Sequence, residues 1–379
     1  MCADWAKYGL PTNAIAPGYF KTPLNKALVD NPGSATMKAV VIHAARDLRV
    51  EERESEAPGA GQVEIAVEAG GICGSDLHYF NHGGFGTVRV RQPMILGHEV
   101  AGTIKALGAS VSGLAIGDRV AVSPSRPCNA CDYCLKGQQN QCLNMRFYGS
   151  AMPMPHIQGA FRQRLVAEAW QCHKVADGIS INEAAFAEPF AVVLHAVNRA
   201  GSLLDKRVLV TGCGPIGALA IVAARLHGAR EIVATDVMAA VLEKALGLGA
   251  DRVINVADAA DQLGAYATNK GYFDVQFEAS GNERAVRSGL EVLKPRGILV
   301  QLGLGGDVSI PQNMVVAKEI EMRGTFRFHE EFGLAVDLIN QKRVDLTSLL
   351  TGVFGLDEAM HAFEVAGDRS RSMKVQLSF

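Results

Sequence analysis

Four cysteines lie close together in a single short segment, Cys128-Asn-Ala-Cys131-Asp-Tyr-Cys134, which is followed by Cys142. Closely spaced thiolates suit zinc, which prefers four soft ligands in a tetrahedron at about 2.3 Å. A set of four thiolates leaves no open coordination position, so the segment predicts a structural zinc site that takes no part in a reaction. Because zinc needs free thiolates, this use of cysteine also favours a reducing, cytoplasmic compartment.

A second group of possible ligands is spread over three segments. It comprises Cys73, the adjacent pair His98-Glu99, and Glu188 in Ala187-Glu188-Pro189. A thiolate, an imidazole and a carboxylate can hold zinc and leave a position for water or a substrate oxygen. A carboxylate in an apolar stretch such as that around Glu188 must be paired or bound to a metal. We therefore expect a catalytic zinc here, with Glu188 as a further ligand or as a neighbour of the ligands. The alternative is that Glu188 is only an acidic residue at the start of a helix.

Ser75 and His78 follow Cys73 closely in the sequence Cys73-Gly-Ser75-Asp-Leu-His78. A hydroxyl beside a zinc-bound alcohol can pass its proton outward, and an imidazole can deliver that proton to water because its pKa lies near neutrality. The two residues are thus candidates for a catalytic proton relay. For His78 the alternative is a solvent-facing side chain without a chemical role.

A glycine-rich segment, Val208-Leu-Val-Thr-Gly212-Cys-Gly214-Pro215-Ile216-Gly217, follows an expected strand and opens an expected helix. In that context the glycines allow the backbone to approach a pyrophosphate, which lies at the helix N-terminus. Asp236 ends the next expected strand, where a carboxylate would bind the ribose hydroxyls of the cofactor. The segment predicts a dinucleotide site for NAD. The negative charge of Asp236 disfavours NADP without excluding it.

Strands and helices that could position these residues alternate regularly after about residue 190. Expected strands are 207–211, 231–235, 252–255, 273–278 and 298–302, and expected helices are 216–226, 239–248 and 283–293. This alternation predicts an α/β fold with a Rossmann doubly wound parallel sheet. The preceding region is rich in strands, glycines and turns and begins with expected strands at 37–42 and 62–67. The tail has expected helices at 332–340 and 357–366 and a strand at 374–379.

Composition limits the possible functions of this chain of 379 residues. It is 48% hydrophobic and 20% charged, and its formal net charge is −2. These values are typical of a globular protein, and the absence of a basic stripe argues against nucleic acid as a partner. No apolar run reaches the ~20 residues needed to cross a bilayer, and no secretory signal is visible.

Residues 1–36 do not fit this plan. Residues 1–33, with Trp5-Ala-Lys-Tyr-Gly9 and Asn13-Ala-Ile-Ala-Pro-Gly-Tyr-Phe-Lys-Thr22, resemble a fragment of short-chain dehydrogenases of the gluconate 5-dehydrogenase type. The fragment lacks the catalytic Tyr-x-x-x-Lys motif and the nucleotide-binding glycines of that family. We interpret the segment as a foreign or vestigial extension, fused from a neighbouring gene or included by a start codon placed too early. An ordinary N-terminal extension is the alternative.

From Met37 onward the two zinc motifs and the glycine fingerprint together resemble the zinc-dependent medium-chain dehydrogenase/reductase superfamily. Gly97-His98-Glu99, Glu188-Pro189 and Arg327 are similar to its polyol branch, which includes sorbitol and xylitol dehydrogenases. Several segments are most similar to the L-idonate 5-dehydrogenases of that branch: Met145–Met152, Pro155-His156, Phe186–Pro189, Phe273–Glu278 and Lys374–Leu377. One departure is Val241, where the polyol branch commonly has an arginine near the adenosine.

The resemblance implies a GroES-like β-rich catalytic domain, made of residues 37–189 and 327–379, and a Rossmann domain of residues 190–326. It implies two zinc ions per chain, catalytic and structural, with NAD or NADP as cofactor. The implied reaction interconverts L-idonate and 5-dehydro-D-gluconate, with Arg327 or Arg146 as the cation for the sugar-acid carboxylate. A homo-oligomer, dimer or tetramer, is also implied. The alternatives are a sorbitol- or xylitol-type dehydrogenase of neutral polyols and a noncatalytic NAD-binding zinc protein.

Overall fold

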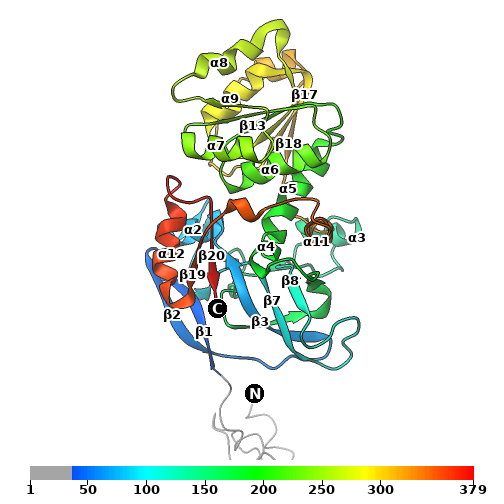
Figure 1. Ribbon diagram of the computed structural model, residues 1–379, viewed down its shortest axis with the longest axis vertical. Coiled ribbons are helices and arrows are strands. Elements are labelled where there is room, and N and C mark those ends of the chain that lie inside the picture. The colour runs from blue at the N-terminus through cyan, green and yellow to red at the C-terminus, as the bar shows by residue number, and fades with distance from the viewer. Residues whose placement is uncertain (1–35) are drawn as a thin grey trace, which may run out of the picture.

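The computed structural model describes residues 36–379, which form two parts stacked along the long axis of the molecule (Figure 1). The predicted foreign segment lies outside the described residues, except that Thr36 already belongs to the first strand, β1 (Thr36–Ala44). Within residues 36–379, no helix is both long and apolar enough to cross a membrane.

The lower part of Figure 1 is built on an antiparallel sheet. Its central strand, β3 (Gln62–Gly71), alternates half-buried and buried residues over most of its length, as expected for a strand with one face on a core. The sheet order is β12-β8-β7-β3-β20-β19, and β11 also pairs with β3. The other strands of this sheet are β7 (Glu99–Leu107), β8 (Arg119–Val122), β11 (Arg164–Glu168), β12 (Cys172–Lys174), β19 (Leu350–Gly355) and β20 (Lys374–Ser378).

The C-terminal strands return to this sheet across the whole intervening chain. In β20, Gln376 lies opposite Gly71 of β3 in an antiparallel ladder, and β19 continues the sheet in parallel beside β20. The last strand of the chain is therefore an interior strand of the lower sheet. The pairing brings residues near Lys374 next to the segment that carries Cys73.

The upper part of Figure 1 is a parallel sheet covered by helices. Its strand order is β15-β14-β13-β16-β17-β18, which is the order of a dinucleotide-binding doubly wound sheet. Its strands are β13 (Arg207–Thr211), β14 (Glu231–Asp236), β15 (Arg252–Asn255), β16 (Phe273–Glu278), β17 (Leu293–Gln301) and β18 (Glu321–Gly324). The central strands are buried apolar runs because helices cover both faces.

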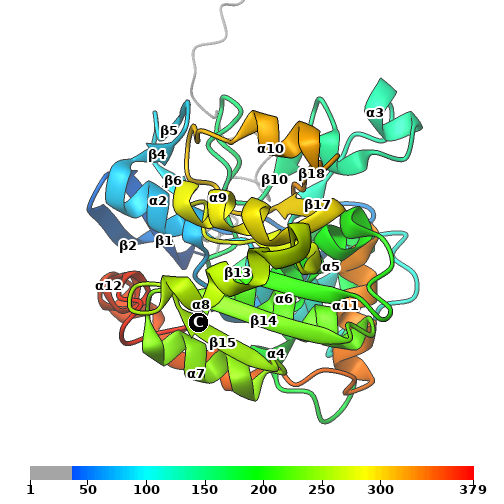
Figure 2. The ribbon, with the colours of Figure 1, turned by 90° about the horizontal axis from the view of Figure 1, so that it is seen from above.

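Helices pack on both faces of the parallel sheet and join the two parts (Figures 1 and 2). Those of the upper part are α6 (Pro215–Leu226), α7 (Ala239–Gly247), α8 (Ala260–Gly264), α9 (Glu283–Val292) and α10 (Gln312–Ala317). The remaining helices are α2 (Gly74–His82), α3 (Asp132–Leu135), α4 (Ile181–Ala184), α5 (Ala187–Ala200), α11 (Glu331–Asn340) and α12 (Ala359–Gly367). One core cluster contains residues of α5, α6, α11 and both sheets, so α5 connects the two parts through continuous apolar packing.

Short elements complete the fold around these sheets. A three-stranded sheet of order β2-β1-β6 contains β2 (Asp47–Glu54) and β6 (Met94–Ile95). Two-residue strands pair as β4 (Gly84–Phe85) with β5 (Val88–Arg89) and as β9 (Ser125–Arg126) with β10 (Arg146–Phe147). The predicted fold class, a Rossmann sheet plus a GroES-like β-rich part, agrees with this architecture. The predicted domain bounds remain an expectation.

The expected elements differ from the structure at a few places. Strand β17 starts five residues before the expected strand 298–302, and the edge strand β18 was not expected. The sequence of β18 is Glu-Met-Arg-Gly, and most of it is exposed, so it lacks the apolar pattern that marks the inner strands. The expected tail helix 357–366 begins as a short 3-10 turn and becomes α12 only at Ala359.

Candidate functional site

Cys73, His98 and Glu99 converge at the top of the antiparallel sheet. Each offers a ligand atom, and these atoms lie within 4.8 Å of one another. Cys73 is the N-cap of α2 directly after β3, and Glu99 begins β7 opposite Gly71. A Cβ on Gly71 would lie 2.0 Å from Oε2 of Glu99, so a larger residue there would displace this carboxylate. The strand pairing thus places a thiol, an imidazole and a carboxylate together, although 25 positions separate Cys73 from His98 in the numbering.

The donor set fits a zinc ion. His98 Nδ1 is buried and has no hydrogen-bond partner within residues 36–379. Glu99 Oε2 is buried too, and its one polar contact there is the ion pair with Lys374 Nζ at 2.5 Å. Burial and the charge of Glu99 raise the pKa of the Cys73 thiol to about 12, whereas a hydrogen bond from the backbone at Ser75 lowers it. A divalent cation would reverse this cost, because a coordinating thiol is deprotonated outright.

Asp76 was not expected from the sequence, yet it holds the two ligand-bearing segments together. Its fully buried carboxylate accepts hydrogen bonds from the amide of Cys73 at 3.1 Å and from the amide of Gly97 at 3.2 Å. His98 Nδ1 lies 3.9 Å from Asp76 Oδ1. The only sequence signal is its place at the third position of α2, where an acidic side chain can reach back to the N-cap amide.

Lys374 is the second unexpected residue of this cluster. Its ammonium donates to Glu99 Oε1 at 2.6 Å and to the carbonyl oxygen of Ile72 at 3.1 Å. The side chains of Lys374 and Glu99 are only 4% and 1% exposed. Burial lowers the pKa of Lys374, but the charge of Glu99 and then that of Cys73 outweigh it, so the pKa is raised. Lys374 belongs to one of the segments that carry the family resemblance, but nothing local in the sequence indicates a role at this site, since β20 reaches it only through its pairing with β3.

Glu188 lies in the first turn of α5, buried near the cluster but outside its 4.8 Å group. Burial raises the pKa of Glu188 to about 8; His98 lowers it, and Glu99 and Cys73 raise it further. Glu188 lies at the start of the helix that connects the two parts, and the charges of all three cluster residues act on its carboxylate. The structure therefore brings Glu188 beside the other three residues without adding it to their group.

The two candidates for a proton relay lie on α2. Ser75 is half-buried in the first turn, and His78 is exposed one turn further along the same helix. Burial lowers the pKa of His78, and the neighbouring His82 lowers it further. The His78 ring lies 6.1 Å from that of His82 and 6.0 Å from that of Phe85, measured between ring centroids. No hydrogen bond between Ser75 and His78 is present in the described part of the chain.

Arg327 and Arg146, the candidate cations, occupy different environments. The Arg327 guanidinium lies 4.2 Å from the centroid of the Phe147 ring, and its backbone has φ = 54°. Burial lowers the pKa of Arg327 to about 10, while the charges of Glu188 and Tyr79 raise it. Arg327 is therefore within electrostatic reach of Glu188, beside the ligand cluster. Arg146 is exposed on the short strand β10.

The four clustered cysteines form a separate centre beside α3. The Sγ atoms of Cys128, Cys131, Cys134 and Cys142 lie within 4.8 Å of one another. The amides of Cys128 and Asn144 donate to Cys142 Sγ at 3.2 and 3.3 Å. A backbone hydrogen bond from Ala130 lowers the pKa of Cys128 to about 6, whereas burial raises that of Cys134 to about 12. Such amide donors stabilise thiolates, as a four-thiolate zinc site requires.

The glycine-rich turn connects β13 to α6 at the carboxyl edge of the parallel sheet. Gly212 has φ = +86°, which favours glycine, and its amide donates to the carbonyl of Thr235 at 2.8 Å. A Cβ on Gly217 would lie 1.7 Å from the carbonyl oxygen of Gly212. Gly214 is the N-cap, Pro215 starts the helix, and Ile216 lies in its first turn. The glycines thus let the turn pack closely against the N-terminus of α6, and a helix N-terminus is where a phosphate group can bind.

Asp236 ends β14 beside this turn and is buried. Its carboxylate accepts hydrogen bonds from three amides, and from the guanidinium of Arg369 at 2.9 Å. Arg369 belongs to the turn between α12 and β20, so this ion pair crosses from one part of the molecule to the other. Sequence reasoning missed Arg369, because the two residues are 133 positions apart.

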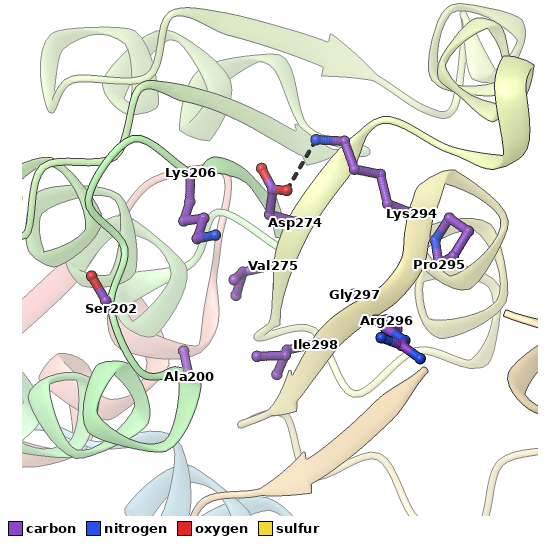
Figure 3. Close-up of a pocket in the computed structure, with 10 residues that line it drawn as sticks. All are labelled: Ala200, Ser202, Lys206, Asp274, Val275, Lys294, Pro295, Arg296, Gly297 and Ile298. Atoms are coloured by element: carbon purple, nitrogen blue, oxygen red, sulfur yellow. Dashed lines mark hydrogen bonds and ion pairs between the residues drawn. The ribbon is translucent and has the colours of Figure 1, made fainter. Parts of the chain in front are cut away.

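A cavity lies at the opposite, amino edge of the same sheet (Figure 3). Its lining includes Lys206 and Asp274, and Lys294 Nζ forms an ion pair with Asp274 Oδ1 at 2.9 Å. Ligands of open α/β sheets bind at the carboxyl ends of the strands. This cavity is therefore separate from the dinucleotide edge.

Comparison with protein-family models gives two matches. Residues 59–177 match the alcohol dehydrogenase GroES-like domain, and residues 215–341 match the zinc-binding dehydrogenase domain. The first covers the segments with both cysteine groups, and the second begins in the glycine-rich turn.

Two curated relatives align with most of the chain. L-idonate 5-dehydrogenase (NAD(P)(+)) of Escherichia coli is 41% identical over 83% of this chain and 91% of its own length. Sorbitol dehydrogenase of Gallus gallus is 35% identical over 89% of this chain and 95% of its own length.

Three solved structures share this fold, and two of them contain a bound cofactor. The crystal structure of Escherichia coli L-idonate 5-dehydrogenase has a TM-score of 0.88 and 38% identity, and the match covers 91% of this chain and 99% of that one. An alcohol dehydrogenase of Escherichia coli with NADH has a TM-score of 0.83 and 26% identity, and the match covers 92% of this chain and 100% of that one. A zinc-binding dehydrogenase of Sinorhizobium meliloti with NADP has a TM-score of 0.82 and 27% identity, and the match covers 91% of this chain and 100% of that one. Taken with the two metal-ligand clusters and the dinucleotide turn, these matches establish that the chain belongs to the zinc- and NAD(P)-dependent medium-chain alcohol and polyol dehydrogenases.

Proposed function

We propose that this enzyme interconverts L-idonate and 5-dehydro-D-gluconate. The observation that carries the proposal is the 41% identity to an L-idonate 5-dehydrogenase over 83% of the chain. The position of Arg327 supports it. A sugar acid differs from a neutral polyol by its carboxylate. The half-buried guanidinium of Arg327, on which the charge of Glu188 acts, is a suitable partner for that carboxylate.

Cys73, His98 and Glu99 would hold the catalytic zinc, with Glu188 as a fourth ligand or as a neighbour that approaches the metal through water. When bound, zinc supplies a Lewis acid that lowers the pKa of a substrate alcohol and polarises a ketone. Asp76 positions these ligands by bonding the two segments that carry them, and Lys374 neutralises Glu99. Such supporting contacts orient metal ligands and tune their basicity.

Ser75 and His78 would carry the proton of the C5 hydroxyl to solvent. The arrangement on α2 supports this role, since the half-buried Ser75 lies near the thiol and the exposed His78 lies one turn away. No direct hydrogen bond joins the two side chains in the described residues, so a substrate hydroxyl or a water molecule would have to complete the relay. A pKa of His78 below its ordinary value keeps the imidazole neutral and able to accept a proton near pH 7.

The pyrophosphate of the nicotinamide cofactor would bind at the glycine-rich turn, which consists of Gly212, Gly214, Pro215, Ile216 and Gly217. Asp236 would bind the adenosine ribose. The cysteines at 128, 131, 134 and 142 would hold the structural zinc. The family membership supports a homo-oligomer as the assembly, and the reducing cytoplasm remains the compartment that we expect from the cysteines.

The substrate assignment is tested by turnover with 5-dehydro-D-gluconate, fructose and xylulose, each with NADH and with NADPH. We expect 5-dehydro-D-gluconate to give the highest kcat/KM. Arg327→Met should lower kcat/KM for 5-dehydro-D-gluconate roughly 10- to 100-fold, because a charge-assisted hydrogen bond contributes about 1.5–3 kcal/mol. It should change the value for fructose far less. Arg146→Met is the matched control, since Arg146 is exposed. A higher kcat/KM for fructose would refute the sugar-acid assignment.

A neutral-polyol dehydrogenase is the second candidate, favoured by the 35% identity to a sorbitol dehydrogenase. It predicts that fructose or xylulose outcompetes the sugar acid and that Arg327→Met affects all substrates alike. The same substrate panel therefore separates the two candidates.

A further inference from the structure

The carboxylate of Asp236 is already fully engaged by protein donors. Its Oδ1 accepts from the amides of Val237 at 2.7 Å and Met238 at 3.1 Å. Its Oδ2 accepts from the amide of Cys213 at 2.8 Å and from the guanidinium of Arg369 at 2.9 Å. A carboxylate offers about four lone-pair sites. A ribose hydroxyl can therefore bind Asp236 only if one of the four donors gives way.

Only one of these four donors can move without unfolding the turn. Three are main-chain amides fixed by the end of β14 and by the glycine-rich turn. The fourth, Arg369, is a side chain on the turn between α12 and β20, and 51% of that side chain is exposed, against 3% of Asp236. An exposed arginine has alternative rotamers in water, so Arg369 is the donor that a ribose hydroxyl would replace.

Arg369 also lies beside the glycine-rich turn. Its Nη2 atom is 4.0 Å from the point that a Cβ on Gly214 would occupy, so the guanidinium lies over the start of α6. If Asp236 holds the adenosine ribose, a phosphate on that ribose would be repelled by the charge of Asp236. The guanidinium offsets that repulsion, and its remaining N–H groups match the geometry of phosphate oxygens.

We propose that Arg369 is a cofactor-specificity residue that allows the site to accept NADP as well as NAD. With NAD, the ribose hydroxyls take the place of Arg369 at Oδ2 of Asp236. With NADP, the guanidinium remains beside Asp236 and binds the 2′-phosphate. Arg369 then contributes to the binding of NADP and contributes little to that of NAD. The inference rests on the dinucleotide site alone and does not depend on the identity of the sugar substrate.

Direct binding of nucleotides to the intact, zinc-loaded enzyme tests this role without turnover. Fluorescence titrations give the Kd for NADPH and NADH, and calorimetry compares adenosine 2′,5′-bisphosphate with 5′-AMP. For Arg369→Ala, we expect the Kd for NADPH to rise at least tenfold (~1.4 kcal/mol). The Kd for NADH should stay within about twofold or fall, because ribose hydroxyls no longer compete with a guanidinium. The binding of adenosine 2′,5′-bisphosphate should weaken in parallel with that of NADPH, and the binding of 5′-AMP should not.

Two further variants make the result decisive. Arg371→Ala removes a neighbouring arginine that is also exposed, and it should leave the NADH-to-NADPH preference unchanged. Arg369→Lys retains the charge but not the planar fork, so we expect an intermediate loss for NADPH, and this variant provides the comparison if the alanine variant does not fold. An equal loss for NADH and NADPH would overturn the proposal, because it would place Arg369 at a group that both cofactors share. Unchanged Kd values for both would overturn it as well.

Discussion

Replacing Lys374 with methionine tests whether a buried ion pair holds the ligand cluster in place. The ammonium and the Glu99 carboxylate are almost completely excluded from solvent, at 4% and 1% exposure of their side chains. Methionine has a similar length and no charge, so the variant leaves a buried carboxylate without a partner. Removing one member of a buried pair costs about 3–5 kcal/mol. We expect a loss of that order in the free energy of unfolding of Lys374→Met.

The magnitude is measured by urea unfolding of four proteins: the natural sequence, Lys374→Met, Glu99→Gln and the double variant. One concentration of EDTA in all samples keeps any metal on Glu99 out of the comparison. The double variant should be less destabilised than the sum of the single variants by about 1–3 kcal/mol, since contacting residues couple. Lys38→Met is the matched control, because Lys38 forms an ion pair with Asp357 at a similar 2.8 Å but with exposed partners. Its loss should stay below about 1 kcal/mol. Additive effects in the four-protein comparison, or a Lys374→Met loss no larger than that of the control, would refute the reasoning.

Three other outcomes follow from the described geometry. Cys134→Ser should lower the zinc content by about one ion per chain in elemental analysis. Cys172 is buried and lies outside both clusters, so Cys172→Ser should leave the zinc content unchanged. Equal zinc contents in the two variants would contradict the four-thiolate site. Gly217→Ala should abolish NADH binding in a fluorescence titration, because its Cβ would lie 1.7 Å from a carbonyl oxygen, whereas Gly247→Ala, with open space around it, should bind NADH normally. Burial would raise the pKa of Glu331, but hydrogen bonds from side chains and from the backbone hold it at about 2. This lowered pKa contributes stability above pH ~4.5 that is lost as the pH falls toward 2. Glu331→Gln should therefore flatten the acid limb of a Tm-against-pH curve, and an unchanged limb would exclude this contribution.

Much of the parallel sheet could be predicted from the sequence, because its inner strands are short apolar runs next to glycine turns. The strands at 207–211, 252–255 and 273–278 have the predicted bounds. The edge strand β18 could not be recognised, since alternating charged residues on an exposed edge do not differ from a loop. Local patterns thus identify the strands that are buried on both faces.

The candidate site shows the same division between local and distant information. The cysteine spacing and the glycine fingerprint are local, so both could be identified in the sequence. Lys374 and Arg369 become meaningful only through contacts with Glu99 and Asp236, which are 275 and 133 positions away. A lysine or an arginine is ordinary in a sequence. The pairing of β20 with β3 brings Lys374 to Glu99, and the turn before β20 brings Arg369 to Asp236.

The interior position of β20 has a consequence for how the protein is made. Synthesis proceeds from the N-terminus, and domains generally fold as units while the chain emerges. Here the antiparallel sheet lacks an interior strand, and Glu99 lacks its counter-charge, until β20 has left the ribosome. The Rossmann sheet has no such dependence, because all of its strands precede residue 325. The cofactor-binding half can therefore be completed first, while the half with the catalytic ligands waits for β20 and exposes an unpaired strand edge in the meantime.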